Sequence, residues 1–323
     1  MAHLLEVKDL TTAFSGDSGD NISVDHVSFH VDEGEVVCVV GESGCGKSVT
    51  SLSIMGLLRR GGTVTDGSVL FDGKDLVKLS EEEMDNIRGD KMTMIFQDPL
   101  TSLNPVFTIG SQITESIRTH MKLSKKEAKE RAISILEKVG MPDAKGIMKK
   151  YPHTLSGGMR QRAMIAMALC CNPSLLIADE PTTALDVTIQ AQIMNLLRDL
   201  QKETGMAMIL ITHDIGLVAQ MADRVIVMYA GQMVEEAPVK ELFKNPKHPY
   251  TKALLDTVPT IRDSADRQLV SIPGIVPENY DNITGCRFAD RCKFCQAECS
   301  NVQEDYEFGP GHTAKCIVMK NKQ

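Results

Sequence analysis

The sequence predicts an α/β fold built on a parallel sheet, and two observations support that prediction. The first is the run Glu35 to Val40, a short valine-rich segment that leads into the glycine-rich loop GESGCGKS and then into an apolar stretch without helix breakers. Short apolar runs of this kind suit strands that are buried on both faces of a sheet. The second is that apolar runs recur at 175–178 and 208–212, with a helical pattern between them. Strands that alternate with helices favour parallel pairing.

Length and charge narrow the class of protein further. A chain of 323 residues exceeds what one core usually organises, so we expect a large domain of about 240 residues and a smaller appendage. The formal net charge of −8 argues against a surface that binds nucleic acid. No segment approaches the roughly 20 apolar residues of a membrane-spanning helix, and the start has no signal-peptide pattern. We expect a cytosolic protein that meets membranes only through other proteins.

Changes along the chain suggest where its parts begin and end. Residues 110–150 are helical and polar in pattern, with Ser124 and Glu127 spaced as a capping box, which predicts a helical insert. After Glu236 frequent prolines exclude long elements, and the clustered cysteines follow. We therefore predict a domain over residues 1–236 and a C-terminal extension over 237–323.

The loop Gly41 to Ser48 has the spacing G-x4-G-K-S between a strand and a helix. Glycines there turn backbone N–H groups toward a phosphate, and the helix N-terminus adds its dipole. Lys47 should hold the β- and γ-phosphates, and Ser48 should ligate Mg²⁺. The pattern predicts nucleotide binding but does not separate kinases, GTPases and transport ATPases. The residues predicted to contact the nucleotide here are Gly41, Ser43, Gly44, Cys45, Gly46, Lys47 and Ser48.

A second part of the predicted site follows the strand in LLIADEP, residues 175–181. Asp179 at the strand end is placed to reach Mg²⁺ through water. The adjacent Glu180 is a candidate general base for the attacking water. A lone Asp-Glu pair is usually a solvated loop, but the phosphate loop upstream favours the catalytic interpretation.

A further glycine pair lies in TLSGGMRQR, where Ser156, Gly157 and Gly158 precede an apolar helix. They predict a second phosphate-binding helix start, which one domain does not need for a single γ-phosphate, so we expect two chains to cooperate. The order of GESGCGKS, Gln97 in IFQDP, LSGGM, LLIADEP, ALD at 184–186 and His213 in ITHD resembles the nucleotide-binding subunits of ABC transporters. The resemblance covers roughly residues 4–236.

This resemblance implies an ABC-type P-loop ATPase with a helical subdomain at about residues 98–165, in which two domains enclose two ATP molecules. Ser156, Gly157 and Gly158 would then serve the partner's ATP. Gln97 matches the residue that contacts Mg²⁺ and the water and senses the membrane subunits, and His213 matches the histidine that holds the γ-phosphate. Phe14 lies where the family places an aromatic ring under adenine. Met159 departs from the family, because most signatures have Gln there, and we expect little loss of hydrolysis.

The C-terminal part resembles the oligopeptide/dipeptide/nickel importer group through HPYTKALLDTVP at 248–259 and IPG at 272–274, and the signature is similar to its D-type subunit. That resemblance implies a heterodimer with an F-type ATPase, two membrane permeases, an external substrate-binding protein, and a peripheral location on the cytoplasmic face of the membrane. It implies peptide as the substrate, while nickel or another small solute remains an alternative. Two other readings are an ABC ATPase that works on ribosomes or DNA and a redox-sensing module.

Nine cysteines remain to be explained. Cys38 lies in a predicted strand, Cys45 in the phosphate loop, and Cys170 and Cys171 at a helix end, so packing accounts for these four. Residues 286–299 read C-x5-C-x2-C-x3-C, and reduced cytosolic thiols favour a metal over disulfides. The spacing does not match the paired C-x2-C of structural zinc sites.

Relatives in the importer group share a pattern like the four cysteines 286, 292, 299 and 316, and some hold a [4Fe–4S] cluster with it. The resemblance therefore implies that Cys286, Cys292, Cys299 and Cys316 ligate a [4Fe–4S] cluster in a small C-terminal appendage and that Cys295 is extra. Zinc and an empty, reduced thiol cluster are the alternatives, because spacing alone does not identify a metal.

Overall fold

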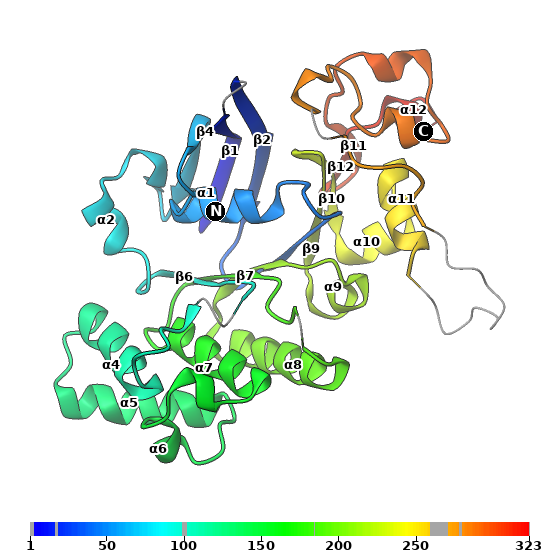
Figure 1. Cartoon of the computed structure of the whole chain (residues 1–323). Coiled ribbons are helices and arrows are strands. Elements are labelled where there is room, and N and C mark those ends of the chain that lie inside the picture. The colour runs from blue at the N-terminus through cyan, green and yellow to red at the C-terminus, as the bar shows by residue number, and fades with distance from the viewer. Residues whose placement is uncertain are drawn as a thin grey trace. The chain divides into compact units, whose positions relative to one another are not determined.

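The computed structural model describes residues 3–16, 19–98, 102–183, 185–258, 271–277 and 280–322 (Figure 1). The chain divides into two units. The first contains Met1–Val31, Val36–Val77 and Ile211–Gln323, and the second contains Asp32–Glu35 and Lys78–Leu210. Among the described helices, none combines the length and the apolar character that crossing a bilayer requires.

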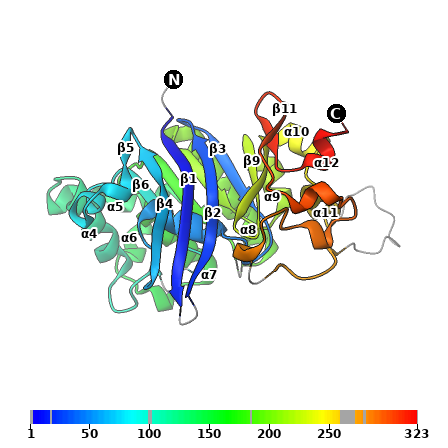
Figure 2. The same ribbon diagram turned by 90° about the horizontal axis from the view of Figure 1, so that it is seen from above.

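The first unit contains an antiparallel sheet in the order β2-β1-β4-β5, and Figure 2 shows β1 between β2 and β4. The bounds are β1 (Leu5–Gly16), β2 (Gly19–Val31), β4 (Gly62–Phe71) and β5 (Lys74–Asp75). No pattern in the sequence predicted this sheet. Register shifts between Val7 and Ala13 break the two-residue alternation of β1, which is the signal that reveals a half-buried strand.

The other strands of this unit run in the order β11-β12-β10-β9-β3. The predicted strand before the glycine loop is confirmed as β3 (Val36–Val40), which is buried along its whole length and pairs in parallel with β9 (Arg224–Tyr229). Antiparallel pairing joins β9 to β10 (Gln232–Pro238), through a tight turn in which Ala230 and Gly231 have positive φ. The C-terminal strands β11 (Tyr306–Gly309) and β12 (His312–Ala314) extend this sheet beyond β10.

The described helices of the first unit are short, with four to nine residues each. The helix α1 (Lys47–Met55) follows the glycine loop and α9 (Ile215–Met221) follows the run at 208–212. Among its described residues, the proline-rich part carries only brief elements, as predicted. Its helical elements are α10 (Val239–Lys244), α11 (Pro249–Asp256), α12 (Ile317–Lys320) and 3-10 turns at Tyr280–Asn282, Ala289–Arg291 and Ala297–Ser300. Because β12 pairs with β10, the segment after residue 237 adds strands to this unit. The domain boundary near 237 stays a prediction.

The second unit contains strands in the order β8-β7-β6, with β6 (Met92–Ile95) and β7 (Leu175–Asp179) in parallel register. The predicted run at 208–212 is β8 (Ala207–Ile211), and the helical pattern before it is α8 (Val187–Thr204). A short helix, α2 (Glu81–Asp85), precedes β6, and a 3-10 turn, Leu76–Lys78, comes before α2. Strand, helix and strand therefore follow one another as the alternation predicts.

The predicted helical insert is present in the second unit. It contains α4 (Ile109–His120), α5 (Lys125–Lys138), α6 (Ala144–Ile147) and a 3-10 turn at Pro152–Thr154, and α7 (Gly157–Leu169) follows. The capping box is confirmed, because the Ser124 Oγ accepts from the Glu127 N–H at 3.3 Å and Glu127 Oε2 accepts from the Ser124 N–H at 2.9 Å. A cap of this kind stabilises a helix by about 1 kcal/mol.

Candidate functional site

The loop Gly41–Ser48 connects β3 to α1, and two of its glycines allow the close approach of other backbone. A Cβ on Gly41 would lie 2.2 Å from the Met228 carbonyl oxygen, and one on Gly46 would lie 2.7 Å from the Ser23 carbonyl oxygen. Gly46 also has φ of 100° at the start of α1, a conformation that favours glycine. Glycine at positions 41 and 46 is therefore required by the path of the chain itself.

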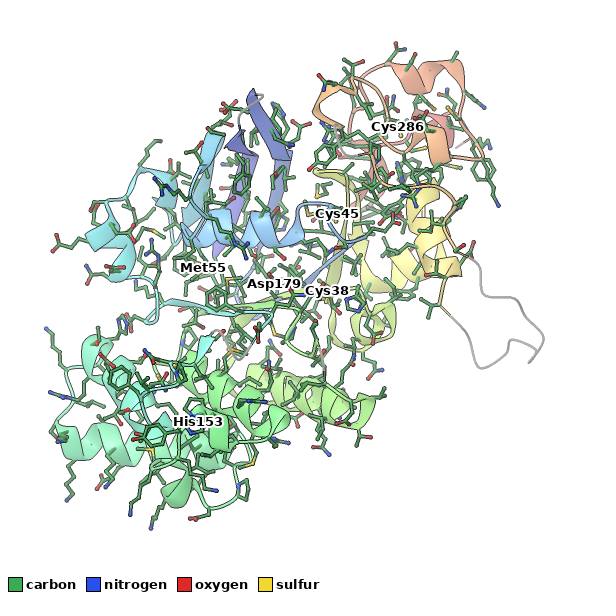
Figure 3. All side chains as sticks on the ribbon, in the orientation of Figure 1. Cys38, Cys45, Met55, His153, Asp179 and Cys286 are labelled. Carbon is green, nitrogen blue, oxygen red and sulfur yellow. The ribbon has the colours of Figure 1, made fainter. Side chains whose placement is uncertain are left out.

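Lys47 and Cys45 have different environments in this loop. The Lys47 ammonium donates to the carbonyl oxygens of Gly41 at 2.8 Å and of Glu42 at 2.9 Å, so its cation lies inside the curve of the loop. The Cys45 side chain is buried, and burial raises the pKa of its thiol. Cys38 on β3 is buried as well (Figure 3). Both thiols are enclosed by protein, and Lys47 donates to the backbone of the loop itself.

Glu42, the second residue of the loop, is held by residues from the C-terminal part of the chain. The Tyr250 hydroxyl accepts a hydrogen bond from the Glu42 N–H at 2.8 Å. The Arg291 guanidinium donates to both carboxylate oxygens of Glu42, at 2.8 Å and 3.0 Å. Neither residue was predicted, because no local pattern in the sequence signals a contact across 208 or 249 positions.

The first unit also contains two of the predicted nucleotide-binding residues outside the loop. His213 is exposed and follows Thr212, whose N–H donates to the Val39 carbonyl oxygen at 3.3 Å near the end of β3. Phe14 is half-buried on β1 and lies across from Gly62, where an added Cβ would be 2.6 Å from the phenyl ring. His213 is thus on a segment paired with the strand that leads into the phosphate loop.

The acidic pair lies in the second unit, at the end of β7. Asp179 is the last residue of the strand and is 5% exposed, whereas the half-buried Glu180 has a left-handed φ of 45°. The Gln97 amide donates to Glu180 Oε2 at 3.0 Å, and the Thr183 hydroxyl donates to the same oxygen at 2.8 Å. The structure therefore brings Gln97 and Glu180 together from positions 83 residues apart. Thr183 was not predicted to contact Glu180. It follows Glu180 by three residues in a turn, and that spacing is a local signal for the contact.

Ser156 is the N-cap of α7, as the pattern predicts, and its Oγ accepts from the Met159 N–H at 3.4 Å. Gly157 and Gly158 form the first turn, and a Cβ on Gly158 would lie 3.0 Å from Ile189 on α8. Further along the helix, the buried Gln161 amide donates to the Pro181 carbonyl oxygen. This hydrogen bond connects α7 to the loop that follows Glu180.

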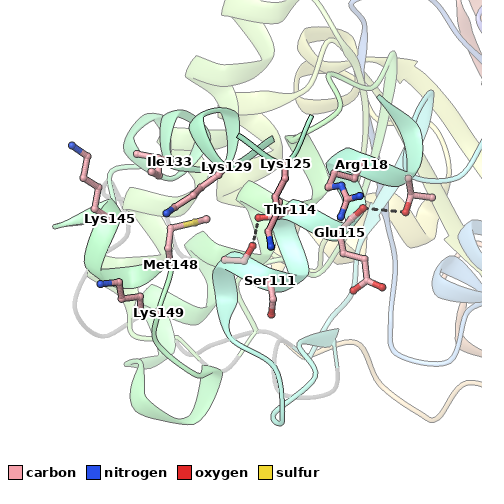
Figure 4. Close-up of a pocket in the computed structure, with 12 residues that line it drawn as sticks. Ser111, Thr114, Glu115, Arg118, Lys125, Lys129, Ile133, Lys145, Met148 and Lys149 are labelled. Atoms are coloured by element: carbon pink, nitrogen blue, oxygen red, sulfur yellow. Dashed lines mark hydrogen bonds between the residues drawn. The ribbon is translucent and has the colours of Figure 1, made fainter. Parts of the chain in front are cut away.

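Part of the ALD motif lies outside the described residues, because Ala184 is not among them. Asp186 caps α8 by accepting from the Ile189 N–H at 3.0 Å. The second unit also holds a cavity of about 980 Å³ whose lining includes basic side chains of α4, α5 and the α6 region (Figure 4). It contains none of the residues predicted to bind nucleotide or metal.

The four cysteines at positions 286, 292, 299 and 316 line one small cavity, and Cys295 does not line it. Cys299 and Cys316 are buried and pack with Val318, and the Cys286 N–H donates to the Cys299 carbonyl oxygen at 2.8 Å. Figure 3 labels Cys286 in this C-terminal part of the chain. Cys295 is exposed.

Three thiols of this cavity, those of Cys286, Cys292 and Cys316, lie in a setting that disfavours the thiolate form. Burial, with smaller contributions from neighbouring cysteines, raises the pKa of Cys286 to about 12. Burial also raises the pKa of Cys292 and of Cys316. A thiolate must form before cysteine binds a metal, so a bound cation would offset this cost and the donor set suits a metal that prefers sulfur.

The remaining cysteines, Cys170 and Cys171, follow the end of α7, as expected, with their sulfurs 3.7 Å apart. Both are buried.

Comparison with known proteins gives two family matches. Residues 24–183 match the family described as ABC transporter, and residues 234–299 match the family described as the C-terminal region of oligopeptide/dipeptide transporters.

The chain is also similar to individual proteins over nearly its whole length. Oligopeptide transport ATP-binding protein AppD of Bacillus subtilis is 51% identical over 324 residues, which cover 100% of this chain and 98% of the relative. Dipeptide transport ATP-binding protein DppD of Haemophilus influenzae is 49% identical over 320 residues, or 99% and 97% of the two chains. Among solved structures, the dimeric ATP-binding cassette MJ0796, in a post-hydrolysis state bound to ADP and Pi, aligns with a TM-score of 0.66 at 30% identity. That alignment covers 73% of this chain and 98% of the other.

Proposed function

The chain belongs to the ATP-binding subunits of ABC transporters of the oligopeptide/dipeptide group, and on this premise we propose that it hydrolyses ATP to power peptide uptake. The observation that carries the proposal is that the ABC transporter match and the match to the oligopeptide/dipeptide C-terminal region lie in one chain, at 24–183 and 234–299. The phosphate loop with its inward Lys47 supports ATP binding. Similarity to AppD and DppD over nearly the whole chain supports a peptide as the cargo.

In the proposed reaction, backbone N–H groups of residues 41–48 and the Lys47 ammonium bind the phosphates, and Phe14 stacks under adenine. Ser48 and Gln97 would hold Mg²⁺, with Asp179 acting through water, and the bound ion would neutralise phosphate charge. Glu180 accepts a proton from a water molecule while the oxygen of that water bonds to the γ-phosphorus. The bond between the γ-phosphorus and the β–γ bridging oxygen breaks, which releases ADP and phosphate. His213 would hold the γ-phosphate.

Gln97 has a specific task in this scheme. Its amide donates to the carboxylate of Glu180, so a shift of the loop that follows β6 changes the hydrogen bonding of the proposed base.

In the first turn of α7, Ser156 and the two glycines would bind the ATP of a second chain. Gln161 would link that turn to the loop after Glu180 through the Pro181 carbonyl oxygen. In this scheme, these contacts would couple the closure of two ATPase chains around ATP to the membrane subunits.

The proposed assembly contains an F-type ATPase partner, two membrane permeases and an external binding protein, with this chain at the cytoplasmic face of the membrane. Val106 and Phe107, which follow the Gln97 segment, are 70% and 52% exposed and support a permease contact in the helical subdomain at about 98–165. Residues 1–236 would form the ATPase domain and 237–323 the extension.

The test of this proposal is reconstitution of the subunit with its F-type partner, permeases and binding protein in lipid vesicles. A peptide-loaded binding protein should stimulate ATP hydrolysis and peptide accumulation. Stimulation by nickel and not by peptide would move the substrate to the alternative. Co-purification with ribosomes or DNA, in place of permeases, would refute the transport role.

We further propose that Cys286, Cys292, Cys299 and Cys316 ligate a [4Fe–4S] cluster in the appendage. The support is that these four thiols line one cavity, that Cys295 lies outside it, and that four thiolates are the usual donor set of such clusters. The cluster would be structural. Zinc, which also accepts four thiolates, is the alternative.

Anaerobic purification tests the cluster. The protein should be brown, Cys295→Ala should keep the colour, and Cys316→Ala should lose it. A colourless anaerobic preparation with stoichiometric zinc would establish the alternative, and one without metal would show that the thiols stay reduced and empty.

A further inference from the structure

Glu42, the second residue of the phosphate loop, forms hydrogen bonds through its N–H, its carbonyl oxygen and its carboxylate. The Glu42 N–H donates to the Tyr250 hydroxyl at 2.8 Å, and the Glu42 carbonyl oxygen accepts from the Lys47 ammonium at 2.9 Å. The Glu42 carboxylate accepts a hydrogen bond from each of the two terminal nitrogens of Arg291. Arg291 and Tyr250 are remote in sequence, so this fastening is a tertiary feature. Successive hydrogen bonds from Arg291 to Glu42 and from Lys47 to Glu42 therefore connect the C-terminal part to the cation predicted to bind phosphate.

Arg291 is itself rigidly placed. Its side chain is 6% exposed, and its Nε donates to the Pro273 carbonyl oxygen at 2.8 Å. Its guanidinium lies over the ring of Tyr229, 5.7 Å from the centroid, and donates to the Tyr229 hydroxyl at 3.2 Å. A guanidinium held on several sides loses little freedom when it grips a carboxylate with two parallel bonds.

The guanidinium lies over the rings of Tyr229 and Phe288, which pack with Tyr250 in a cluster drawn from three parts of the first unit. Tyr229 is on β9, Tyr250 on α11 and Phe288 in the cysteine segment, with centroids 4.7 Å to 5.4 Å apart. Tyr229 and Tyr250 are fully buried. The position of Arg291 therefore depends on a packed aromatic cluster, and a change in that cluster would reach the phosphate loop.

Two consequences for ATP follow from this geometry. A loop already held in its binding conformation does not have to be ordered when the nucleotide arrives, which favours tighter binding. In addition, Arg291 neutralises a carboxylate one residue into a loop that must receive a highly charged triphosphate. Without Arg291, the Glu42 charge would repel the phosphates.

We propose that Arg291 is a positioning residue for ATP binding: through its paired bonds to Glu42, the cysteine segment holds the phosphate loop in its nucleotide-binding form. Arg291 lies directly before Cys292, and Arg287, which donates to Asp25 and to the Ala230 carbonyl oxygen, lies directly after Cys286. The stretch that carries both cysteines is thus held by Asp25 and Ala230 at one end and by Glu42 of the phosphate loop at the other. The inference rests on ATP binding at the loop and not on the peptide substrate or the metal.

The test measures binding of an ATP analogue with a non-hydrolysable β–γ bridge to the full chain, for Arg291→Met, Glu42→Gln and the double variant. Arg291→Met should weaken binding about tenfold, within the usual range of coupling between sites. The double variant should bind more tightly than Arg291→Met, because the unpaired carboxylate is gone. In the reconstituted importer, Arg291→Met should raise KM for ATP and leave kcat unchanged.

Arg224→Met is the matched control. Arg224 is likewise a largely buried partner of a carboxylate, Glu236, but its backbone pairs with Val37, at the end of β3 away from the phosphate loop. It should lower the melting temperature without weakening ATP binding.

The proposal is overturned if Arg291→Met, folded by circular dichroism, binds the analogue as tightly as the unaltered chain. It is also overturned if the losses of the two single variants multiply in the double variant, since Arg291 would then act on ATP by a route other than Glu42.

Discussion

Replacement of Glu180 by Gln tests the proposed general base with little disturbance of structure. In the structure one carboxylate oxygen of Glu180 accepts two hydrogen bonds, from Gln97 at 3.0 Å and from Thr183 at 2.8 Å. The amide oxygen of Gln can accept both, so the side chain should keep its place. Hydrogen bonds to a neutral amide oxygen are weaker than those to a carboxylate, so the variant should lose about 1 kcal/mol of folding stability.

The cost to catalysis should be much larger. General base catalysis contributes about 10²–10⁴-fold to rate, so the barrier should rise by about 3 to 5 kcal/mol. ATP binding should survive, because the phosphate loop and Lys47 are untouched. The assay is single-turnover hydrolysis in the reconstituted complex beside ATP binding by calorimetry. A Glu180→Gln complex that hydrolyses ATP at more than about a tenth of the normal rate, with binding intact, would refute the assignment of the base.

Three other predictions concern the same site. Lys47→Ala should weaken ATP binding about 100-fold, because the triphosphate loses a buried cation, and unchanged calorimetric affinity would contradict this. Ser156→Ala should leave ATP binding by the isolated chain unaltered and lower hydrolysis in the assembled importer, because the signature would serve the partner's nucleotide; equal loss in both assays would place Ser156 at its own chain's ATP. The isolated chain should hydrolyse ATP slowly and speed up when the F-type partner and permeases are added, and a fast rate that is independent of dilution would show that one chain completes the site.

Local patterns predicted much of the structure. The strands before Gly41 and before Glu180 were found because a short run of buried apolar residues is unlike its surroundings. The start of α5 was found because Ser124 and Glu127 satisfy each other's backbone across three residues. The antiparallel sheet was missed, because the shifts of register in β1 hide the alternation that defines a half-buried strand.

By itself, the sequence determined the chemical inventory of this protein: a phosphate loop, an acidic pair after a strand, a signature at a helix start and a cysteine cluster. These are short motifs whose spacing is a property of local backbone geometry, so they can be read without a fold. Only the tertiary structure decided which groups meet. It set Gln97 and Thr183 on one oxygen of Glu180, gathered four of five C-terminal cysteines around a cavity, and placed Tyr250 and Arg291 on Glu42. Contacts between positions 208 and 249 residues apart depend on how sheets and turns pack, and no local rule of sequence encodes that distance.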